Sequence, residues 1–193
     1  TALIDLDKDW NVTRFDVFPS VIRSCFRFTY KRVQEILDEE KTHSLKDKIK
    51  QLEKLSKNLF KKRTEMGSID FDIPEPIFSI GKEGIPHEIR PSERLQSHRI
   101  VEECMLLANR LVAERYGVIN GKPVPFVYRT HPKPKSEDIT SFLLLLKRIG
   151  FSLQKKHDPH TSKGMRDILE DVEDSPYKGL IESVALRAMS KAN

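Results

Sequence analysis

The stretch HRIVEECMLLANRLVAERYG, residues 98–117, combines an apolar helical face with two adjacent acids. At 100° per residue, one face collects the following apolar side chains: Ile100, Val101, Cys104, Leu107, Ala108, Leu111 and Val112. This spacing predicts a long helix over residues 92–116 that buries one side against the rest of the fold.

The two acids of this helix are predicted to have different roles. Glu103 lies in line with Arg110 and Glu114, which are four residues apart, so this flank is predicted to be a row of surface charges. Glu102 lies on the opposite flank and has no basic residue three or four positions after it. Glu102 is therefore the stronger candidate for contact with a polar ligand, and a solvated acid is the open alternative.

The chain before this helix contains a predicted hairpin and two predicted helices. Residues 2–7 and 12–18 alternate around the turn KDWN, which is typical of a β-hairpin. A helix is expected after Thr29, its N-cap, and a second over residues 44–66, with Ser44 as N-cap and Gly67 just beyond its end. The short connection between them predicts an antiparallel helical hairpin.

The remaining elements mix strands and helices without regular alternation. Residues 68–91 change to a period of two and predict a hairpin around KEG, and PFVYRTHPKP, residues 125–134, is expected to be a strand. The helices expected after it are residues 136–149, capped by Ser136 and ended by Gly150, then 164–174 and 177–192 after a loop at 154–164. This order favours an α+β fold with mixed or antiparallel strands.

Positive charge is concentrated in one segment. The 193-residue chain has a net charge of +5 and a pI near 9.1, and residues 41–63 hold nine Lys or Arg against two acids. Such a stripe favours a polyanionic partner, although a solvated helix face explains it equally well.

The two cysteines, Cys25 and Cys104, stand in apolar surroundings without metal-binding spacing, which predicts buried, reduced thiols in the cytoplasm.

No apolar run is long enough to span a membrane, and no leader pattern is present. Because the sequence begins at Thr1, we expect a processed chain or, better, a piece excised from a longer one.

Three aspartates near the N-terminus partly match a metal-binding motif. Asp5, Asp7 and Asp9 match the start of a calcium loop, but Trp10 stands where glycine is needed. Acids near a hairpin turn explain this pattern better.

His157 and His160 are three apart, but the proline between them argues against a helical pair of metal ligands. No P-loop, GxSxG or HExxH motif is present, so the chain shows no catalytic constellation of its own.

Several blocks together resemble the RNB exoribonucleases, the ribonuclease II and ribonuclease R family. The blocks are FPSVIRSCFRFTYKRVQEIL, GSIDFDIPEP, IVEECMLLAN and FVYRTHPKPKSEDITSF, in family order along almost the whole chain. GSIDFDIPE is more similar to ribonuclease R than to ribonuclease II, although Met66 stands where the family often has arginine.

The resemblance implies that residues 1–193 are the middle to C-terminal part of an RNB catalytic domain. The family's aspartate block, which holds Mg²⁺, and its cold-shock and S1 modules are not in these residues, and neither is its TSPIRRY-type segment. The implied parent is a processive, hydrolytic 3′→5′ exoribonuclease acting on single-stranded RNA, monomeric, cytoplasmic and unattached to membranes. The isolated chain is expected to be inactive.

Three residues match RNA-contacting positions of the family. The resemblance implies that Tyr30 helps select RNA over DNA, that Phe71 clamps the terminal bases, and that Glu102 contacts the terminal ribose. Core packing is the open alternative for Tyr30, and for Phe71 packing beside Ile69 and Ile73.

Arg129, His131 and Lys135 belong to a further matched motif, for which a supporting or RNA-backbone role is expected without firm assignment. Two other readings of the whole chain stay open. One is a non-catalytic RNA- or protein-binding module on an RNB scaffold, and the other is a helical interaction domain unrelated to RNA.

Overall fold

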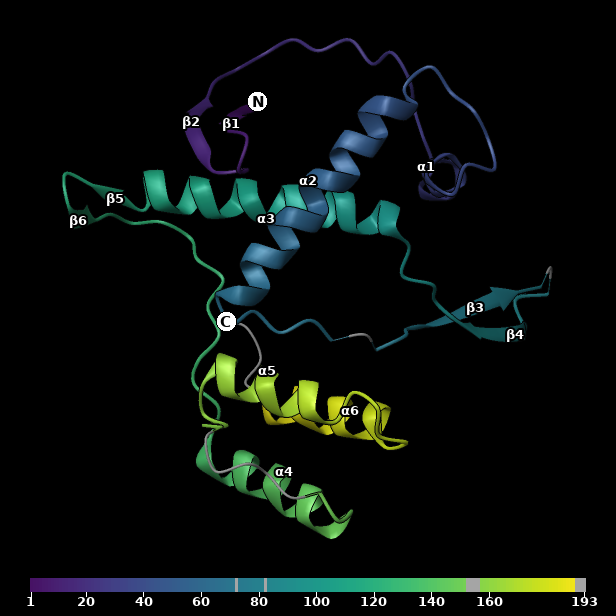
Figure 1. The fold of residues 1–193 in the computed structure, drawn as a ribbon, viewed down its shortest axis with the longest axis vertical. Coiled ribbons are helices and arrows are strands. Elements are labelled where there is room, and N and C mark those ends of the chain that lie inside the picture. Colours follow the sequence, from purple (N-terminus) through teal and green to yellow (C-terminus); the bar gives the residue numbers. More distant parts are fainter. Residues whose placement is uncertain (72, 82, 152–156, 190–193) are drawn as a thin grey trace. The chain divides into compact units, whose positions relative to one another are not determined.

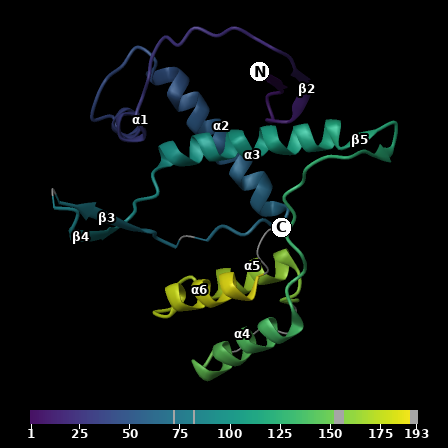
Figure 2. The same cartoon turned by 180° about the vertical axis from the view of Figure 1, so that it is seen from behind.

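Residues 1–62 together with 93–127 form one folding unit, and residues 63–92 with 128–193 form a second. The computed structural model describes residues 1–71, 73–81, 83–151 and 157–189 (Figures 1 and 2). Outside the described residues lie Asp72 and Lys82, the first part of the predicted 154–164 loop, and the end of the predicted last helix. Six helices and three antiparallel strand pairs in the described part confirm the α+β prediction.

The first unit begins with the predicted hairpin. Strands β1 (Ala2–Leu6) and β2 (Val12–Val17) are antiparallel. In the turn, the carboxylate of Asp7 accepts hydrogen bonds from the backbone N–H groups of Asp9, at 2.9 Å, and Asn11, at 2.8 Å. The hydrogen bond from the backbone N–H of Asn11 is the main reason that the pKa of Asp7 is lowered. Asp7 therefore stabilises a hairpin turn, which is the explanation that its position in the sequence favours.

Helix α1 (Tyr30–Leu37) starts where the sequence predicts. The side chain of Thr29 accepts a hydrogen bond from the backbone N–H of Arg32 at 3.2 Å, so Thr29 is the N-cap. Ile36 is fully buried and defines the inner face of this short helix.

The prediction that the first two helices pack against each other as an antiparallel hairpin is wrong. Among the described residues α1 packs against α3 (Gln96–Tyr116), and the side-chain oxygen of Gln34 accepts from the backbone N–H of Ser97 at 3.2 Å. Helix α2 (Lys46–Glu65) crosses α3 (Figure 1). Periodicity identifies the buried face of each helix, but it does not specify which partner covers that face.

Helix α2 ends in the predicted glycine turn. Gly67 has a φ of 94°, and its N–H donates to the carbonyl of Thr64 while that of Ser68 donates to Arg63. These two bonds satisfy the last carbonyls of the helix, and the left-handed conformation requires glycine. At the other end, the structure starts the helix at Lys46, and the Nδ1 atom of His43 accepts from the N–H of Leu45.

The second unit is built around three helices. These are α4 (Ser136–Arg148), α5 (Ser162–Asp171) and α6 (Lys178–Ala188). Their core consists of Ile139, Phe142, Leu146, Met165, Ile168, Val172, Ile181, Ala185 and Ala188.

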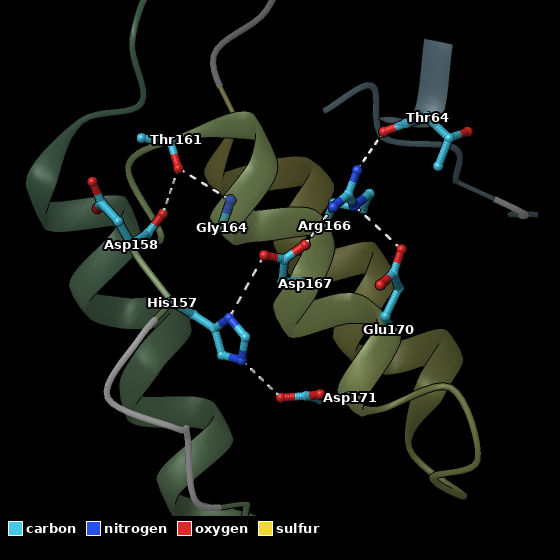
Figure 3. A network of polar contacts seen from close by, with 9 residues as sticks. All are labelled: Thr64, His157, Asp158, Thr161, Gly164, Arg166, Asp167, Glu170 and Asp171. Carbon is cyan, nitrogen blue, oxygen red and sulfur yellow. Dashed lines mark hydrogen bonds and ion pairs between the residues drawn. The ribbon is translucent and has the colours of Figure 1, made fainter. Parts of the chain in front are cut away.

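The start of α5 depends on a close approach between two segments. The side chain of Thr161 accepts from the N–H of Gly164 at 3.0 Å, and a Cβ at position 164 would overlap the carbonyl of Asp158. Only glycine fits there. Later in the helix, Arg166 donates to the carbonyl of Thr64, which ties the end of α2 to α5 (Figure 3).

The predicted hairpin around KEG is confirmed. Strands β3 (Pro76–Ile80) and β4 (Pro86–Pro91) are antiparallel, with Phe78 opposite Ile89. Both of these side chains are exposed.

The prediction of a strand over residues 125–134 is wrong, because this segment is irregular. Its prolines lack the N–H groups that a strand ladder needs. A short hairpin precedes it instead, with β5 (Val118–Ile119) and β6 (Lys122–Pro123) joined by Asn120 and Gly121, both at positive φ. An Asn-Gly pair is a strong signal for such a two-residue turn.

The predicted cap at the start of α4 needs correction. Ser136 is the first residue of α4, and Lys135 holds the N-cap position without a side-chain hydrogen bond. Gly150 does end this helix, with a φ of 80°.

In the described residues no helix combines the length and apolar character needed to cross a membrane.

The thiols are free, as predicted, but Cys25 is exposed rather than buried. Its apolar neighbours Val21 and Ile22 are exposed as well, so apolar surroundings in sequence did not create a core here. Cys104 is half-buried, and burial raises the pKa of its thiol, with a further contribution from the nearby charge of Glu103.

Candidate nucleic-acid interface

Glu102 is held by an arginine from the segment before α3. The Nη2 atom of Arg94 lies 3.1 Å from one carboxylate oxygen of Glu102 and 3.0 Å from the other. Both side chains are partly exposed, at 27% for Arg94 and 37% for Glu102. The carboxylate is thus anchored while part of its surface stays accessible.

Tyr30 contacts the same end of α3. Its ring lies on the ring of His98, with centroids 4.3 Å apart and planes tilted by 57°. His98 and Glu102 are four residues apart on α3, so they lie on the same side of the helix. The structure therefore brings two of the three predicted RNA-contacting residues, Tyr30 and Glu102, to the first turns of α3.

Phe71 belongs to the second unit. It is partly buried and packs, with Ile69, against the helical core of that unit. Ile73 is 37% exposed, so it shares less of this packing. The contact is the one expected from the core-packing alternative, and the role of Phe71 in RNA binding stays a prediction.

The prediction of a surface position for Glu103 is wrong. Arg110 and Glu114 form the expected exposed pair at 3.7 Å, but Glu103 is only 3% exposed. Glu103 follows Ile100 by three residues and precedes Leu107 by four, and both are buried. Helical spacing alone would therefore have placed Glu103 on the buried face. The surface position was predicted because its side chain is charged.

The buried face of α3 also differs from the predicted one at its edge. Val101 is 41% exposed, and Met105 and Leu106 are 58% and 39% exposed. The buried face is rotated toward Glu103, and on that flank the Arg99 guanidinium lies over the Phe60 ring of α2, 4.9 Å from its centroid.

The motif that contains Arg129, His131 and Lys135 lies in the irregular segment before α4. All three residues are exposed, and Lys135 is the N-cap residue of α4. Their predicted supporting or RNA-backbone role stays a prediction.

The basic segment 41–63 uses part of its charge internally. Lys46 and Lys50 lie 3.3 and 2.6 Å from the carboxylate of Glu39, and the hydrogen bond from Lys50 is the main reason that the pKa of Glu39 is lowered. Lys62 donates to backbone carbonyls in the turn of the first hairpin. The charge available to a polyanion is therefore smaller than the sequence count indicates.

The side chain of His157 takes part in a polar network with α5. Figure 3 shows the His157 ring between two carboxylates of α5, with Nε2 3.1 Å from Asp171 and Nδ1 3.8 Å from Asp167. His160 makes a different contact, in which its backbone N–H donates to Asp158. The described residues hold no group of three or more His, Cys, Asp or Glu suited to a metal ion.

Sequence reasoning missed Arg94 and His98. Arg94 precedes the helix and lies eight residues before Glu102, so a search for partners one turn away does not reach it. His98 offered a weak signal, because it stands one turn before Glu102.

Comparison with known proteins settles the family. The RNB domain profile matches residues 1–193. The chain belongs to the RNB family. This confirms the resemblance carried by the four sequence blocks.

Curated RNB relatives point to one branch of the family. The chain is 35% identical over 197 residues to Ribonuclease R of Aquifex aeolicus, covering all of this chain and 27% of that protein. It is 32% identical over 186 residues to Ribonuclease R of Escherichia coli, covering 94% of this chain and 22% of that protein. The chain thus spans about a quarter of the length of these relatives.

Solved structures share the RNB fold. RNase R of Mycoplasma genitalium in its apo form superposes with a TM-score of 0.85 at 19% identity, covering 99% of this chain and 30% of that one. Yeast Ssd1, described as a pseudonuclease, gives a TM-score of 0.68 at 15% identity, covering 98% and 22%. The RNB fold therefore occurs with and without nuclease activity.

Proposed function

We propose that this chain is part of a processive, hydrolytic 3′→5′ exoribonuclease of the ribonuclease R type that degrades single-stranded RNA. The observation that carries the proposal is the 35% identity, along the entire chain, to a protein named Ribonuclease R. Solved M. genitalium RNase R structures that share the fold include complexes with ribose-methylated single-stranded RNA and with double-stranded RNA.

Within this proposal, the chain supplies contacts to the RNA rather than the chemistry of cleavage. The carboxylate of Glu102 accepts a hydrogen bond from the 2′-hydroxyl of a terminal ribose, which DNA lacks. Tyr30 is 47% exposed and contacts His98, one turn before Glu102, and it offers a ring face and a hydroxyl to the same nucleotide. Phe71 is assigned to the terminal bases, and bases of any identity stack on an aromatic ring.

The Mg²⁺ of the proposed enzyme is assigned to residues outside this chain. The described residues do not fit such an ion, because they contain no cluster of three or more candidate ligands. No catalytic step is therefore assigned to the residues of this chain. The proposed protein is a monomeric, cytoplasmic enzyme without membrane attachment.

The test compares the parent protein with a Glu102→Ala variant on matched RNA and DNA oligonucleotides. A lost hydrogen bond to a charged group costs about 1.5–3 kcal/mol, so the ratio of the RNA rate to the DNA rate should fall roughly tenfold to a hundredfold. Glu114→Ala, on the exposed side of the same helix, is the control and should leave the ratio unchanged. An unchanged ratio in Glu102→Ala would remove Glu102 from the proposed ribose contact.

The chain alone is expected to bind RNA weakly, in a salt-sensitive manner, and not to degrade it in the presence of Mg²⁺. Stepwise 3′ shortening that co-purifies with the 193-residue chain would contradict its assignment as a part without catalytic residues.

The second candidate function is a non-catalytic RNA- or protein-binding module. It is favoured by the similarity of the fold to Ssd1, a pseudonuclease. A parent protein that binds RNA but leaves it intact under conditions where a ribonuclease R degrades it would support this alternative.

A further inference from the structure

We propose that Arg94 and His98 are positioning residues of the ribose-reading site, where Arg94 orients the carboxylate of Glu102 and His98 orients the ring of Tyr30. This inference rests on the proposed function, because it assumes that Tyr30 and Glu102 contact RNA.

Arg94 restricts a side chain that is otherwise free to rotate. Glu102 has three rotatable bonds and is 37% exposed, so the carboxylate alone would sample several orientations. The Arg94 guanidinium contacts both carboxylate oxygens, at 3.1 and 3.0 Å. A carboxylate has about four acceptor sites, so two contacts from Arg94 leave room for a hydroxyl donor.

His98 is itself fixed by the start of α3. Its Nδ1 atom accepts a hydrogen bond from the backbone N–H of Leu95 at 3.1 Å, which closes the first turn of the helix. In the neutral ring this assigns the proton to Nε2 and sets the plane of the imidazole. The ring of Tyr30 contacts this imidazole, with the two centroids 4.3 Å apart and the ring planes tilted by 57°.

A second contact keeps the two helices in register at this point. Gln34, one turn after Tyr30 in α1, accepts a hydrogen bond from the backbone N–H of Ser97, the neighbour of His98. The segment 94–102 therefore holds both proposed RNA-contacting side chains through two different supports.

The experiment measures the ratio of RNA to DNA degradation rates, together with kcat and KM on RNA, for the parent protein carrying single substitutions. Arg94→Gln removes the charge and Arg94→Lys keeps it. His98→Asn removes the ring but keeps an acceptor near the helix start, whereas His98→Phe keeps the ring. Arg110→Gln, which breaks an exposed pair on the same helix, is the matched control.

We expect the ratio to fall about tenfold in Arg94→Gln and His98→Asn, to fall less in Arg94→Lys and His98→Phe, and to stay unchanged in Arg110→Gln. A loss of stability alone lowers both rates together and leaves the ratio intact. If one severe variant does not fold, the paired conservative variant still has to lower the ratio by more than twofold.

The outcomes separate the two proposals. A wild-type parent that does not degrade RNA refutes the proposed function, and the positioning roles fall with it. A wild-type parent that degrades RNA and loses selectivity in Glu102→Ala, but keeps its ratio within about twofold in all four Arg94 and His98 variants, overturns this inference alone.

Discussion

Replacing the buried Glu103 by alanine is expected to lower the free energy of unfolding by about 1–2 kcal/mol. The side chain is 3% exposed and lies between Ile100 and Leu107 on the inner face of α3. The one lost methylene group accounts for about 0.8 kcal/mol, and the lost polar interaction of the carboxylate for about 0.5–1.5 kcal/mol. The higher helix propensity of alanine offsets a few tenths of a kcal/mol.

The assay is urea denaturation of the chain followed by helical circular dichroism, with Glu114→Ala as the control. Glu114 lies on the same helix but its side chain is 63% exposed, so its replacement should change the free energy of unfolding by less than about 0.5 kcal/mol. If Glu103→Ala costs no more than Glu114→Ala, then the burial of Glu103 does not stabilise the fold and the reasoning from exposure is refuted.

Three further predictions concern other parts of the chain. Phe142→Ala, which empties a fully buried site in the core of the second unit, should cost about 3–5 kcal/mol, as measured by denaturation; a loss below 1 kcal/mol would contradict the core assignment. Iodoacetamide should modify the exposed Cys25 before Cys104, whose thiol has a raised pKa because it is partly buried; mass spectrometry after timed quenching would show the order, and faster labelling of Cys104 would contradict it. The pKa of Asp7 lies below its ordinary value of 3.8 because Asn11 donates to its carboxylate, so the stabilisation is present above pH 4 and is lost as the pH falls through the lowered pKa. The unfolding midpoint of wild type should therefore exceed that of Asp7→Asn at pH 7 and approach it in stronger acid, and a difference that grows on acidification would show the opposite linkage.

Local features of the fold could be predicted because their causes lie within a few residues. A hydroxyl at Thr29 satisfies an N–H three residues on, and glycine at 67 and 150 adopts the positive φ that ends a helix. Such interactions need no distant partner, so a sequence pattern is sufficient to locate them.

The candidate site was only partly predictable. Family motifs made Tyr30 and Glu102 candidates for RNA contact, which stays a prediction, but they did not point to the residues that contact these two side chains. Arg94 reaches Glu102 from an extended segment outside the helix, and His98 meets Tyr30 only because α1 packs against α3. Neither contact follows from helical spacing.

By itself, the sequence determined the α+β class, the approximate positions of the helices and of the first two hairpins, and the RNB family, because turn chemistry, periodicity and ordered motifs lie in neighbouring residues. Only the tertiary structure decided that α1 packs on α3, that Glu103 points inward, and that Cys25 stays exposed. Burial depends on which surfaces meet, and those surfaces come from segments distant in the chain.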